Sequence, residues 1–298
     1  MRPIEITEVG PRDGLQNEPG VIPTGAKVAF VDRLSRTGVR EIEVSSFVSP
    51  KWVPQLADAG EVFRNIRREP GVIYSALVPN MKGLERALEA GVDKIAVFTA
   101  ASETFNRKNI NASIEASLER FRPVIQEAKG VGLPVRGYVS TAFHCSYEGP
   151  VPPERVWPVV DALLNLGVDE VSLGDTIGKA SPRDVRRLLE LLLPRVPVEQ
   201  VVLHFHATYG MAVANVLTAW EEFEVYRFDA SAGGLGGCPY APGASGNVAT
   251  EDVVYALQRM GAEVSVDLEA VIQAVAAIRP HLQHAPHSHL YAVRMRGT

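Results

Sequence analysis

The fold is predicted from one junction in the chain, Leu166-Gly167-Val168-Asp169-Glu170-Val171-Ser172-Leu173-Gly174-Asp175. An amphipathic run over residues 152–166 predicts a helix, and Gly167 is the residue type that most readily adopts the left-handed conformation in which helices end. Val168 then leads into a predicted strand, Glu170–Asp175, which ends on a carboxylate. The same glycine–valine junction recurs at Gly38-Val39 and Gly91-Val92. The chain therefore repeats a unit in which a helix ends at a glycine and a strand follows.

Outward from this junction, short β-rich runs alternate with longer amphipathic runs. The predicted strands are Ile4–Thr7, Glu41–Phe47, Val72–Val78, Lys94–Thr99, Val135–Ala142, Glu170–Asp175, Val201–His206 and Arg227–Ala232. The predicted helices are Thr24–Thr37, Met81–Ala90, Asn111–Val131, Pro152–Leu166, Ser181–Leu193, Met211–Phe223 and Thr250–Met260, with N-caps at Thr24, Ser181 and Thr250. Eight strand–helix units in series predict an α/β fold, the (β/α)8 TIM barrel. The alternative is an open doubly wound sheet, but the first strand–helix turn lacks the GxGxxG pattern of that fold.

The C-terminal part of the chain predicts an extra helix over Asp267–Arg279, followed by a tail without a clear period. No linker or low-complexity segment divides the chain. We therefore expect one catalytic domain over residues 1–298, with the barrel at about 1–262 and a C-terminal helical segment and tail at 263–298.

The composition narrows the classes of function. A net charge of −5 and a pI of about 5.9 argue against nucleic acid as the main partner and give no sign of binding to a membrane surface. Two cysteines, Cys145 and Cys238, form no disulfide framework and fit a reducing cytosol. The N-terminus enters a strand pattern without a signal or transit peptide, and no apolar run approaches the ~18 residues of a membrane span. We expect a cytoplasmic protein.

Polar residues gather where the predicted strands stop, and active sites of (β/α)8 barrels lie at this end of the strands. They are Arg12 and Asp13 after the first strand, Glu43, Ser45 and Ser46 at the second, Asp175 and Thr176 at the sixth, and His204 and His206 at the seventh. A glycine-rich stretch, residues 233–247, follows the eighth strand. The sequence therefore predicts one functional site at the carboxyl end of the barrel.

His204-Phe205-His206 is the clearest sign of a metal site. Residues i and i+2 of a strand face the same side, so both imidazoles would point into the barrel mouth. Two imidazoles and a carboxylate suit a divalent metal, and Asp13 could supply the carboxylate. The alternative is a pair of buried, hydrogen-bonded histidines.

Arg12 and Glu43 place opposite charges near the same end of the barrel. Arg12 could stabilise a developing enolate oxygen, and the alternative is a local ion pair with Asp13 on a surface turn. Glu43 lies between apolar residues and needs a partner, for which Arg12 is a candidate. Such a pair could be purely structural, and it would also hold Arg12 in place.

The glycine-rich stretch carries two further candidates. Its six glycines predict left-handed turns or a close approach of the backbone to a ligand. Cys238 could be a small core residue, but a thiol between Gly237 and Pro239 favours a reactive role. Asn247 could cap the following helix or act as a neutral oxygen ligand for Mg²⁺ or Mn²⁺.

Other features give weaker functional signals. Asp175 either brackets a turn or binds substrate, or a water on the metal, at the barrel mouth. Trp52, just past the second strand, is expected to pack rather than to act in catalysis. The histidines of the tail show no ligand spacing: His281, His284, His287 and His289.

Four segments together resemble the hydroxymethylglutaryl-CoA lyases, from near residue 4 to about residue 260. They are residues 8–18 (EVGPRDGLQNE), 43–55 (EVSSFVSPKWVPQ), 204–210 (HFHATYG), and 233–247 with ATED at 249–252. The first segment is shared more loosely with related Claisen-type synthases. The second segment and the cysteine-containing stretch are much more specific to the lyases.

The resemblance implies a pyruvate-carboxyltransferase-like barrel that cleaves 3-hydroxy-3-methylglutaryl-CoA, an acyl-CoA thioester, to acetyl-CoA and acetoacetate, as in leucine degradation and ketone-body metabolism. It implies that Mg²⁺ or Mn²⁺ is held by Asp13, His204, His206 and Asn247. It further implies Arg12 at the thioester carbonyl, Cys238 as proton donor, and Glu43 and Asp175 in support. The general base would be His204 or a water on the metal. A homodimer is the state that the family suggests.

One residue departs from the family pattern. The family usually has Asp or Asn directly after His-x-His, and here that position is Ala207. A metal-binding histidine commonly has its second nitrogen held by an acceptor. If the missing side chain has that role, or binds water near the metal, Ala207 predicts weaker metal retention or a changed choice of substrate.

Three alternatives stay open from the sequence. Ala207 is compatible with a lyase for a longer-branched analogue of hydroxymethylglutaryl-CoA. A Claisen-condensing acyl transferase of the isopropylmalate or homocitrate synthase type is the second, although little chain remains after residue 262 for the accessory regions of such enzymes. A barrel retained only for binding is disfavoured, because every implied ligand and Cys238 are present.

Overall fold

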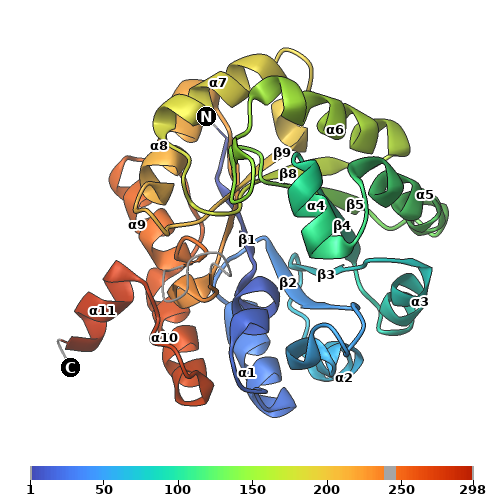
Figure 1. The fold of residues 1–298 in the computed structure, drawn as a ribbon. Coiled ribbons are helices and arrows are strands. Elements are labelled where there is room, and N and C mark those ends of the chain that lie inside the picture. The colour runs from blue at the N-terminus through green and yellow to red at the C-terminus, as the bar shows by residue number, and fades with distance from the viewer. Residues whose placement is uncertain (1, 238–245, 297–298) are drawn as a thin grey trace.

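Parallel strands close into a barrel in the computed structural model, which describes residues 2–237 and 246–296 (Figure 1). The strands of the barrel are β1 Glu5–Glu8, β2 Glu41–Ser46, β3 Ile73–Leu77, β4 Lys94–Ala100, β5 Val135–Ser140, β8 Glu170–Asp175, β9 Val201–Phe205 and β10 Arg227–Ala230. Around the ring they follow the order β1-β10-β9-β8-β5-β4-β3-β2. A short hairpin, β6 His144–Cys145 and β7 Gly149–Pro150, follows β5. The predicted (β/α)8 TIM barrel is confirmed.

Helices surround the outside of the ring (Figure 1). They are α1 Thr24–Leu34, α2 Ala59–Asn65, α3 Met81–Glu89, α4 Glu103–Ile110, α5 Ile114–Gly130, α6 Pro153–Leu166, α7 Pro182–Leu192, α8 Ala212–Phe223, α9 Thr250–Arg259, α10 Leu268–Ile278 and α11 His289–Arg296. All the predicted helices are present, including the extra helix after the barrel. The sequence pattern does not predict α2, α4 or α11.

A local break explains the error between α4 and α5. Asn111 ends α4 in the left-handed conformation, with φ of 52°. Ser113 then caps α5, because its hydroxyl accepts the amide of Ala116 at 3.0 Å. Hydrophobic periodicity does not reveal such a break. The helix predicted over Asn111–Val131 therefore begins three residues too early, and α4 goes unpredicted.

Only Ser181 is confirmed among the three predicted N-caps. Ser181 and Asp184 form a capping box, in which the Asp184 carboxylate accepts the Ser181 amide at 3.0 Å. The predictions for Thr24 and Thr250 are wrong, because each is the first residue inside its helix. Their hydroxyls donate to distant carboxylates instead, to Asp58 at 2.8 Å and to Glu8 at 2.7 Å.

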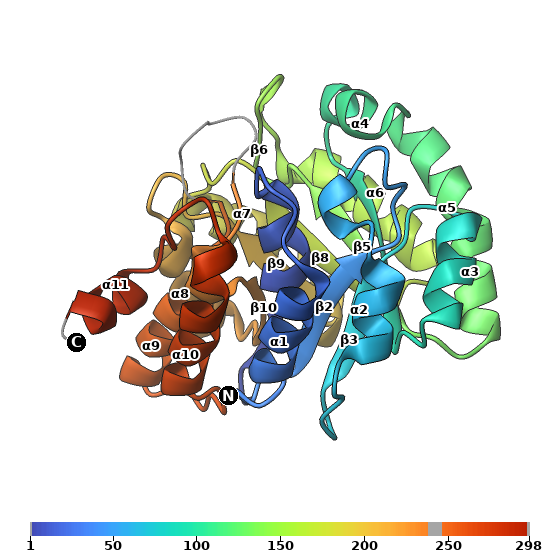
Figure 2. The same ribbon diagram turned by 90° about the horizontal axis from the view of Figure 1, so that it is seen from below.

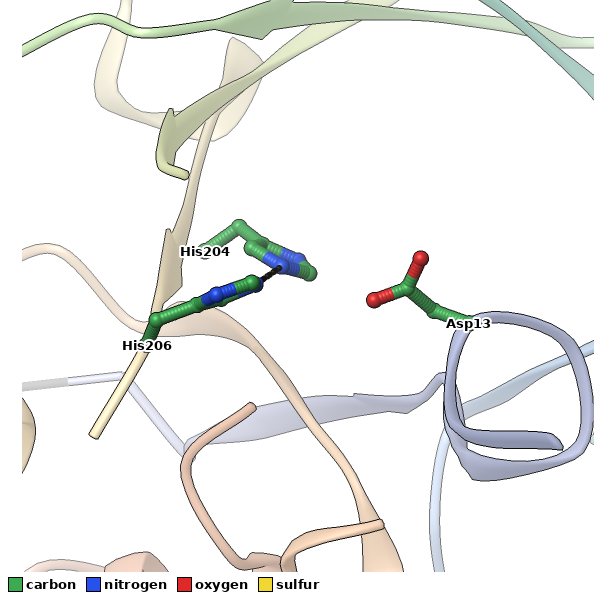
Figure 3. Close-up of side chains that lie close together, drawn as sticks. All are labelled: Asp13, His204 and His206. Carbon is green, nitrogen blue, oxygen red and sulfur yellow. Dashed lines mark hydrogen bonds between the residues drawn. The ribbon is translucent and has the colours of Figure 1, made fainter. Parts of the chain in front are cut away.

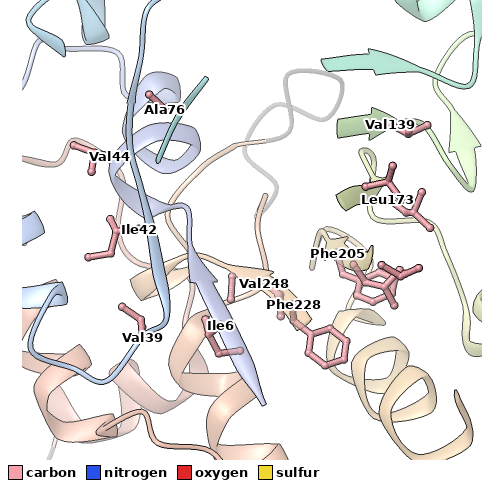
Figure 4. Packing of buried hydrophobic residues seen from close by; sticks show 14 of the residues in the cluster. Ile6, Val39, Ile42, Val44, Ala76, Val139, Leu173, Phe205, Phe228 and Val248 are labelled. Atoms are coloured by element: carbon pink, nitrogen blue, oxygen red, sulfur yellow. The ribbon is translucent and has the colours of Figure 1, made fainter. Parts of the chain in front are cut away.

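The main core lies between the barrel and its helices. Figure 4 shows side chains of this core from different strands, among them Ile42, Val139, Leu173, Phe205 and Phe228. Each of these five is at most 1% exposed. Burial of one such side chain contributes about 1.5–3 kcal/mol. The outer faces of the strands therefore supply the apolar surface that holds the helices against the ring.

The inside of the barrel is charged, although branched apolar side chains usually fill this space in TIM barrels. Arg136 on β5 is 1% exposed and donates to side chains of four other strands. These are Glu170 on β8 at 2.5 Å, Asp229 on β10 at 2.9 Å, Thr7 on β1 at 3.0 Å and Glu41 on β2 at 3.2 Å. Lys94 on β4 also donates to Glu41, at 2.7 Å. Paired charges thus form the floor of the barrel.

The C-terminal segment lies outside the ring. The helix α10 packs beside α1, and α11 projects from the body of the protein near α9 (Figure 2). Asp252, in the first turn of α9, accepts the amides of His289 and Leu290 at 2.9 and 2.8 Å and so fixes the start of α11. Within residues 2–237 and 246–296, no helix is both long and apolar enough to cross a membrane.

Two glycines in the left-handed conformation give a matched test of the packing ahead of β2. Gly38 has φ of 87°, and a Cβ there would lie 2.4 Å from the Ser265 carbonyl oxygen; Gly132 has φ of 82° and open space around it. We expect Gly132→Ala to lower the free energy of unfolding by about 1–2 kcal/mol through conformation alone. Gly38→Ala should cost clearly more, because backbone must also move. Urea unfolding of both variants measures the difference, and equal losses would contradict the close packing at Ser265.

Candidate active site

One turn of π-helix carries Arg12 and Asp13 at the end of β1. It spans Gly10–Gly14, and the amides of Arg12, Asp13 and Gly14 all donate to the Val9 carbonyl, at 2.8–3.2 Å. A Cβ at Gly14 would lie only 2.9 Å from Cβ of Leu235. The turn is therefore pressed against the segment that follows β10.

Asp13, His204 and His206 come together at the barrel mouth. Each offers one ligand atom, and these atoms lie within 4.8 Å of one another. The Nε2 atoms of the two histidines are 3.2 Å apart. Figure 3 shows the two imidazole rings facing the Asp13 carboxylate across the same space. The structure thus brings together three residues that the sequence placed at the ends of two different strands.

Asn247 joins this group through the backbone. It forms an antiparallel bridge with His206, just past the end of β9. Its Nδ2 donates to Oδ2 of Asp13 at 2.9 Å and to the Leu235 carbonyl at 3.1 Å. Its side chain does not cap α9, whose N-cap is Ala249. The capping alternative for Asn247 is therefore wrong.

The free atoms of these residues fit a divalent cation. Oδ1 of Asn247 is buried and accepts no hydrogen bond from the described residues. Buried polar atoms normally have a partner, so an unpaired oxygen beside a carboxylate and two imidazoles is suited to an ion. Two oxygens and two nitrogens form a donor set that Mg²⁺ tolerates and Mn²⁺ accepts.

The charge states of Asp13 and His206 also favour a cation. Burial works to raise the pKa of Asp13, but the charges of Arg12 and the two histidines outweigh it and lower that pKa to about 2. Burial and the neighbouring His204 lower the pKa of His206 to about 3. At neutral pH the site therefore holds an ionised carboxylate and a neutral imidazole.

Asp229 is a functional residue that the sequence reasoning missed. Its Oδ2 lies 3.2 Å from Nδ1 of His204 and accepts the Ser172 hydroxyl at 2.8 Å, while its Oδ1 accepts from Arg136. A carboxylate at Nδ1 leaves Nε2 as the nitrogen that can face a metal. Burial opposes it, but the bond to Asp229 raises the pKa of His204 above its ordinary value. The only sequence signal is a charged residue inside a predicted strand, as for Glu43.

Arg12 is held on three sides. Its Nε donates to Oε2 of Glu43 at 2.6 Å, its Nη1 donates to Asp13, and its guanidinium lies 5.6 Å from the centre of the Tyr138 ring. The Tyr138 hydroxyl donates to the same Glu43 oxygen at 3.3 Å. Burial raises the pKa of Glu43 although Arg12 opposes it. The pair of Arg12 and Glu43 that the sequence suggested is present in the structure.

The remaining candidates take varied positions. Both carboxylate oxygens of Asp175 accept backbone amides, of Lys179 and Ala180 at 3.0 Å each, so this residue brackets the turn after β8. Burial raises its pKa to about 7, against those two hydrogen bonds. Cys238 lies outside the described residues. Trp52 is 83% exposed, so the prediction that it packs is wrong. Of the tail histidines, His284 approaches a carboxylate, Glu18, at 3.6 Å.

A cavity of about 740 Å³ opens above these residues. Its inner part is lined by Arg12, Asp13, Tyr138, His204, His206 and Gly237. Its outer part is lined by side chains of the segments after β2, β3 and β4, among them Trp52, Asn80, Phe105, Lys108 and Arg120. The cavity therefore runs from the ligand residues to a rim that carries two cations, Lys108 and Arg120.

Comparisons with known proteins agree with this arrangement. The family model described as HMGL-like matches residues 3–278. The chain belongs to the HMGL-like family. A curated relative, the hydroxymethylglutaryl-CoA lyase of Bacillus subtilis, is 53% identical over 271 residues, which are 91% of this chain and 90% of that protein.

Solved structures of HMG-CoA lyases have the same fold. The crystal structure of the Bacillus subtilis HMG-CoA lyase gives a TM-score of 0.97 at 50% identity and covers 99% of both chains. An HMG-CoA lyase from Acinetobacter baumannii, in complex with coenzyme A and 3-methylmalate, gives 0.92 at 40% identity and covers 97% of this chain and 94% of that one. The resemblance inferred from the four sequence segments is confirmed.

Ala207, the residue that departs from the family pattern, lies beside the proposed metal ligands. Its amide donates to the Gly246 carbonyl at 2.7 Å, next to the bridge between His206 and Asn247. The acceptor at Nδ1 of His204 is Asp229, so Ala207 does not deprive that histidine of its partner. Nδ1 of His206 is buried without a hydrogen bond from the described residues. If the missing side chain at position 207 normally binds a histidine, that histidine is His206 rather than His204. Weaker metal retention caused by Ala207 stays a prediction.

The affinity of the site for Mn²⁺ should depend on one proton. Asp13 and His206 need release none near neutral pH, whereas His204, with its raised pKa, must lose a proton to bind an ion. Below the pKa of His204, the apparent Kd should therefore rise about tenfold for each unit by which pH falls. Calorimetric titration from pH 5.5 to 8 measures this slope. In Asp229→Asn the rise should begin at lower pH, and a two-proton slope in the parent would contradict the assigned charge states.

Proposed function

We propose that this chain cleaves 3-hydroxy-3-methylglutaryl-CoA to acetyl-CoA and acetoacetate, with a divalent cation held by Asp13, His204, His206 and Asn247. The observation that carries the proposal is the unpaired Oδ1 of Asn247 beside the other three ligands. The HMGL-like family supports the substrate, because the relative at 53% identity is a hydroxymethylglutaryl-CoA lyase. The complex of a structural relative with coenzyme A supports an acyl-CoA thioester.

The proposed reaction has three parts: the C3 hydroxyl loses its proton, the C2–C3 bond breaks, and C2 is then protonated. The tertiary hydroxyl on C3 loses its proton, and its oxygen becomes the ketone of acetoacetate. The electrons of the C2–C3 bond pass to the thioester, which becomes the enolate of acetyl-CoA. A bound divalent cation would lower the pKa of the substrate's C3 hydroxyl. The protein must then stabilise an enolate oxygen and protonate C2.

In this proposal, Arg12 stabilises the enolate oxygen. Its Nε is bound to Glu43 and its Nη1 to Asp13, its side chain lines the cavity, and Nη2 makes no hydrogen bond with the described residues. A donor fixed before the reaction stabilises developing charge without reorganising. Glu43 and Tyr138 therefore act through Arg12 in this proposal.

The two roles that the sequence suggested for His204 exclude each other at any one moment. Nδ1 is engaged by Asp229, so Nε2 is the nitrogen that faces the site. One nitrogen cannot hold an ion and accept the hydroxyl proton together. We assign Nε2 of His204 to the ion, and we propose that water in the cavity accepts the proton.

Cys238 is proposed as the acid that protonates C2, on the strength of the sequence. Gly237, the residue before it in the chain, lines the cavity. Asp175 is proposed to support the site through the turn after β8, since each of its carboxylate oxygens accepts a backbone amide. The choice between Mg²⁺ and Mn²⁺, the homodimer and the cytoplasmic location stay predictions from the sequence.

The direct test is release of acetoacetate from hydroxymethylglutaryl-CoA by the purified protein. We expect release with Mg²⁺ or Mn²⁺ and its loss after EDTA, with recovery when the metal is restored. Asn247→Ala should keep the fold and weaken metal binding at least tenfold, because a neutral oxygen ligand is removed. Activity that survives complete removal of metal would contradict the proposal, and so would an Asn247→Ala variant with unchanged affinity.

The rim of the cavity should bind the phosphates of CoA. Lys108 and Arg120 are exposed cations that line its outer part. We expect Lys108→Ala and Arg120→Ala each to raise KM several-fold and to leave kcat nearly unchanged, because they would contact substrate far from the reacting carbons. The matched control is Arg107→Ala, whose side chain pairs with Glu103 at 3.5 Å and does not line the cavity. Steady-state kinetics would reject this assignment if all three variants behaved alike.

A further inference from the structure

A small apolar cluster lies apart from the main core. It consists of Leu77 at the end of β3, Ala96 and Phe98 on β4, Tyr138 on β5 and Val48 just after β2, and we name it the apolar wall. Four of these five side chains, all except Ala96, line the cavity above the ligand residues. The apolar wall therefore forms a surface of the cavity, whereas the main core packs between strands and helices.

The order of the strands places the β3 and β4 side chains of the apolar wall opposite the proposed ligand residues. In a ring of eight strands, the strand four places away lies across the barrel. By this count β5 lies across from β1, β4 from β10 and β3 from β9. Asp13 follows β1, His204 lies on β9, and Asp229, which contacts His204, lies on β10. Leu77 and Phe98 thus lie on the strands across from those of the proposed metal ligands, and the Tyr138 ring reaches between the two sides, with its centre 6.3 Å from that of the His204 ring.

Closing the barrel does not require apolar side chains at this place. The floor below is already filled by paired charges, with Arg136 bonded to four other strands. Phe98 and Val48 are only half-buried, and burial against water is what gives apolar surface its energetic value. Ligand cavities are mostly apolar with a few placed polar groups, and these side chains supply that apolar part here.

The inference rests on the proposed function and concerns the substituent on C3. That carbon carries a hydroxyl, a carboxymethyl group, the C2 atom and an alkyl group. The first two are polar and suit the side of the metal ligands, and C2 must lie near Arg12. The alkyl group is then the one left to face the opposite side. We propose that the apolar wall selects this alkyl group, admitting methyl and resisting longer chains.

A matched exchange of one methylene group tests the proposal. Leu77→Val removes one methylene from the apolar wall, and 3-ethyl-3-hydroxyglutaryl-CoA adds one to the substrate. A methylene in an apolar pocket changes kcat/KM by about 10–200-fold, so the parent should prefer the methyl substrate by at least about tenfold. We expect Leu77→Val to reduce this preference about tenfold. The control is Leu203→Val, the same change on β9 but in the main core, which should leave the preference unchanged.

Binding without turnover gives an independent measurement. The thioesters 3-methylglutaryl-CoA and 3-ethylglutaryl-CoA lack the hydroxyl and cannot be cleaved. Their Kd values, measured by calorimetry, should show the same shift in Leu77→Val. Val48→Leu enlarges a half-buried side chain that lines the cavity, and it should weaken 3-methylglutaryl-CoA relative to glutaryl-CoA, which has no branch.

The outcomes separate this inference from the proposed function. If the parent cleaves hydroxymethylglutaryl-CoA but neither variant changes the ratios between thioesters, the apolar wall does not select the alkyl group. Equal changes for all thioesters would instead place the pantetheine arm of CoA on the apolar wall and would overturn the proposal. A parent that cleaves none of them removes the proposed function, and the inference falls with it.

Discussion

The buried guanidinium of Arg136 is the constraint on which the rest of the structure depends. It lies inside the barrel and bonds to carboxylates on β2, β8 and β10, so it links strands that are far apart in the sequence. One of these carboxylates is Asp229, whose other oxygen lies 3.2 Å from Nδ1 of His204. Removing one partner from such a buried pair leaves an uncompensated charge, which is costly. One carboxylate, that of Asp229, therefore both pairs with Arg136 inside the barrel and orients His204 at its mouth.

Close backbone contacts assemble the rest of the site. A Cβ on Gly236 would lie 2.7 Å from Nδ2 of Asn247, and one on Gly246 would lie 2.9 Å from the backbone of Gly236 and Gly237. The two described ends of the glycine-rich stretch therefore touch, and Asn247 is held where they meet. Only glycine leaves room for this approach. The proposed metal ligands thus come from three distant segments, which close backbone contacts hold together.

Local period and chain order are enough to predict that Asp13, His204 and His206 come together. The strand period of two places His204 and His206 on one side, and the rule for barrel strand ends places Asp13 near them. The same patterns do not single out Asp229. A carboxylate inside a strand gives the same sequence pattern whether it pairs with Arg136, like Glu170, or binds a histidine, like Asp229. They also predict Thr24 and Thr250 as caps, since the distant partners of these hydroxyls cannot be seen in a linear pattern.

The apolar wall is a second feature that the sequence pattern does not predict. Leu77, Phe98 and Tyr138 are ordinary residues within their own strands, and only the order of strands around the ring sets them across from the metal ligands. Trp52 is a further example, because a large apolar residue is expected to pack and here is exposed at the rim. The division of the sequence into a barrel of about 1–262 and a tail of 263–298 stays a prediction.

We propose that the side chains of Asp13, His204, His206 and Asn247 hold one divalent cation at the barrel mouth. Crystals grown with Mn²⁺ and measured near the manganese absorption edge would test it most directly, because anomalous scattering locates the ion independently of its surroundings. We expect one strong peak, coordinated by the Asp13 carboxylate, Nε2 of His204, Nε2 of His206 and Oδ1 of Asn247. A peak held by other residues, or no peak in crystals whose protein binds Mn²⁺ in solution, would contradict it.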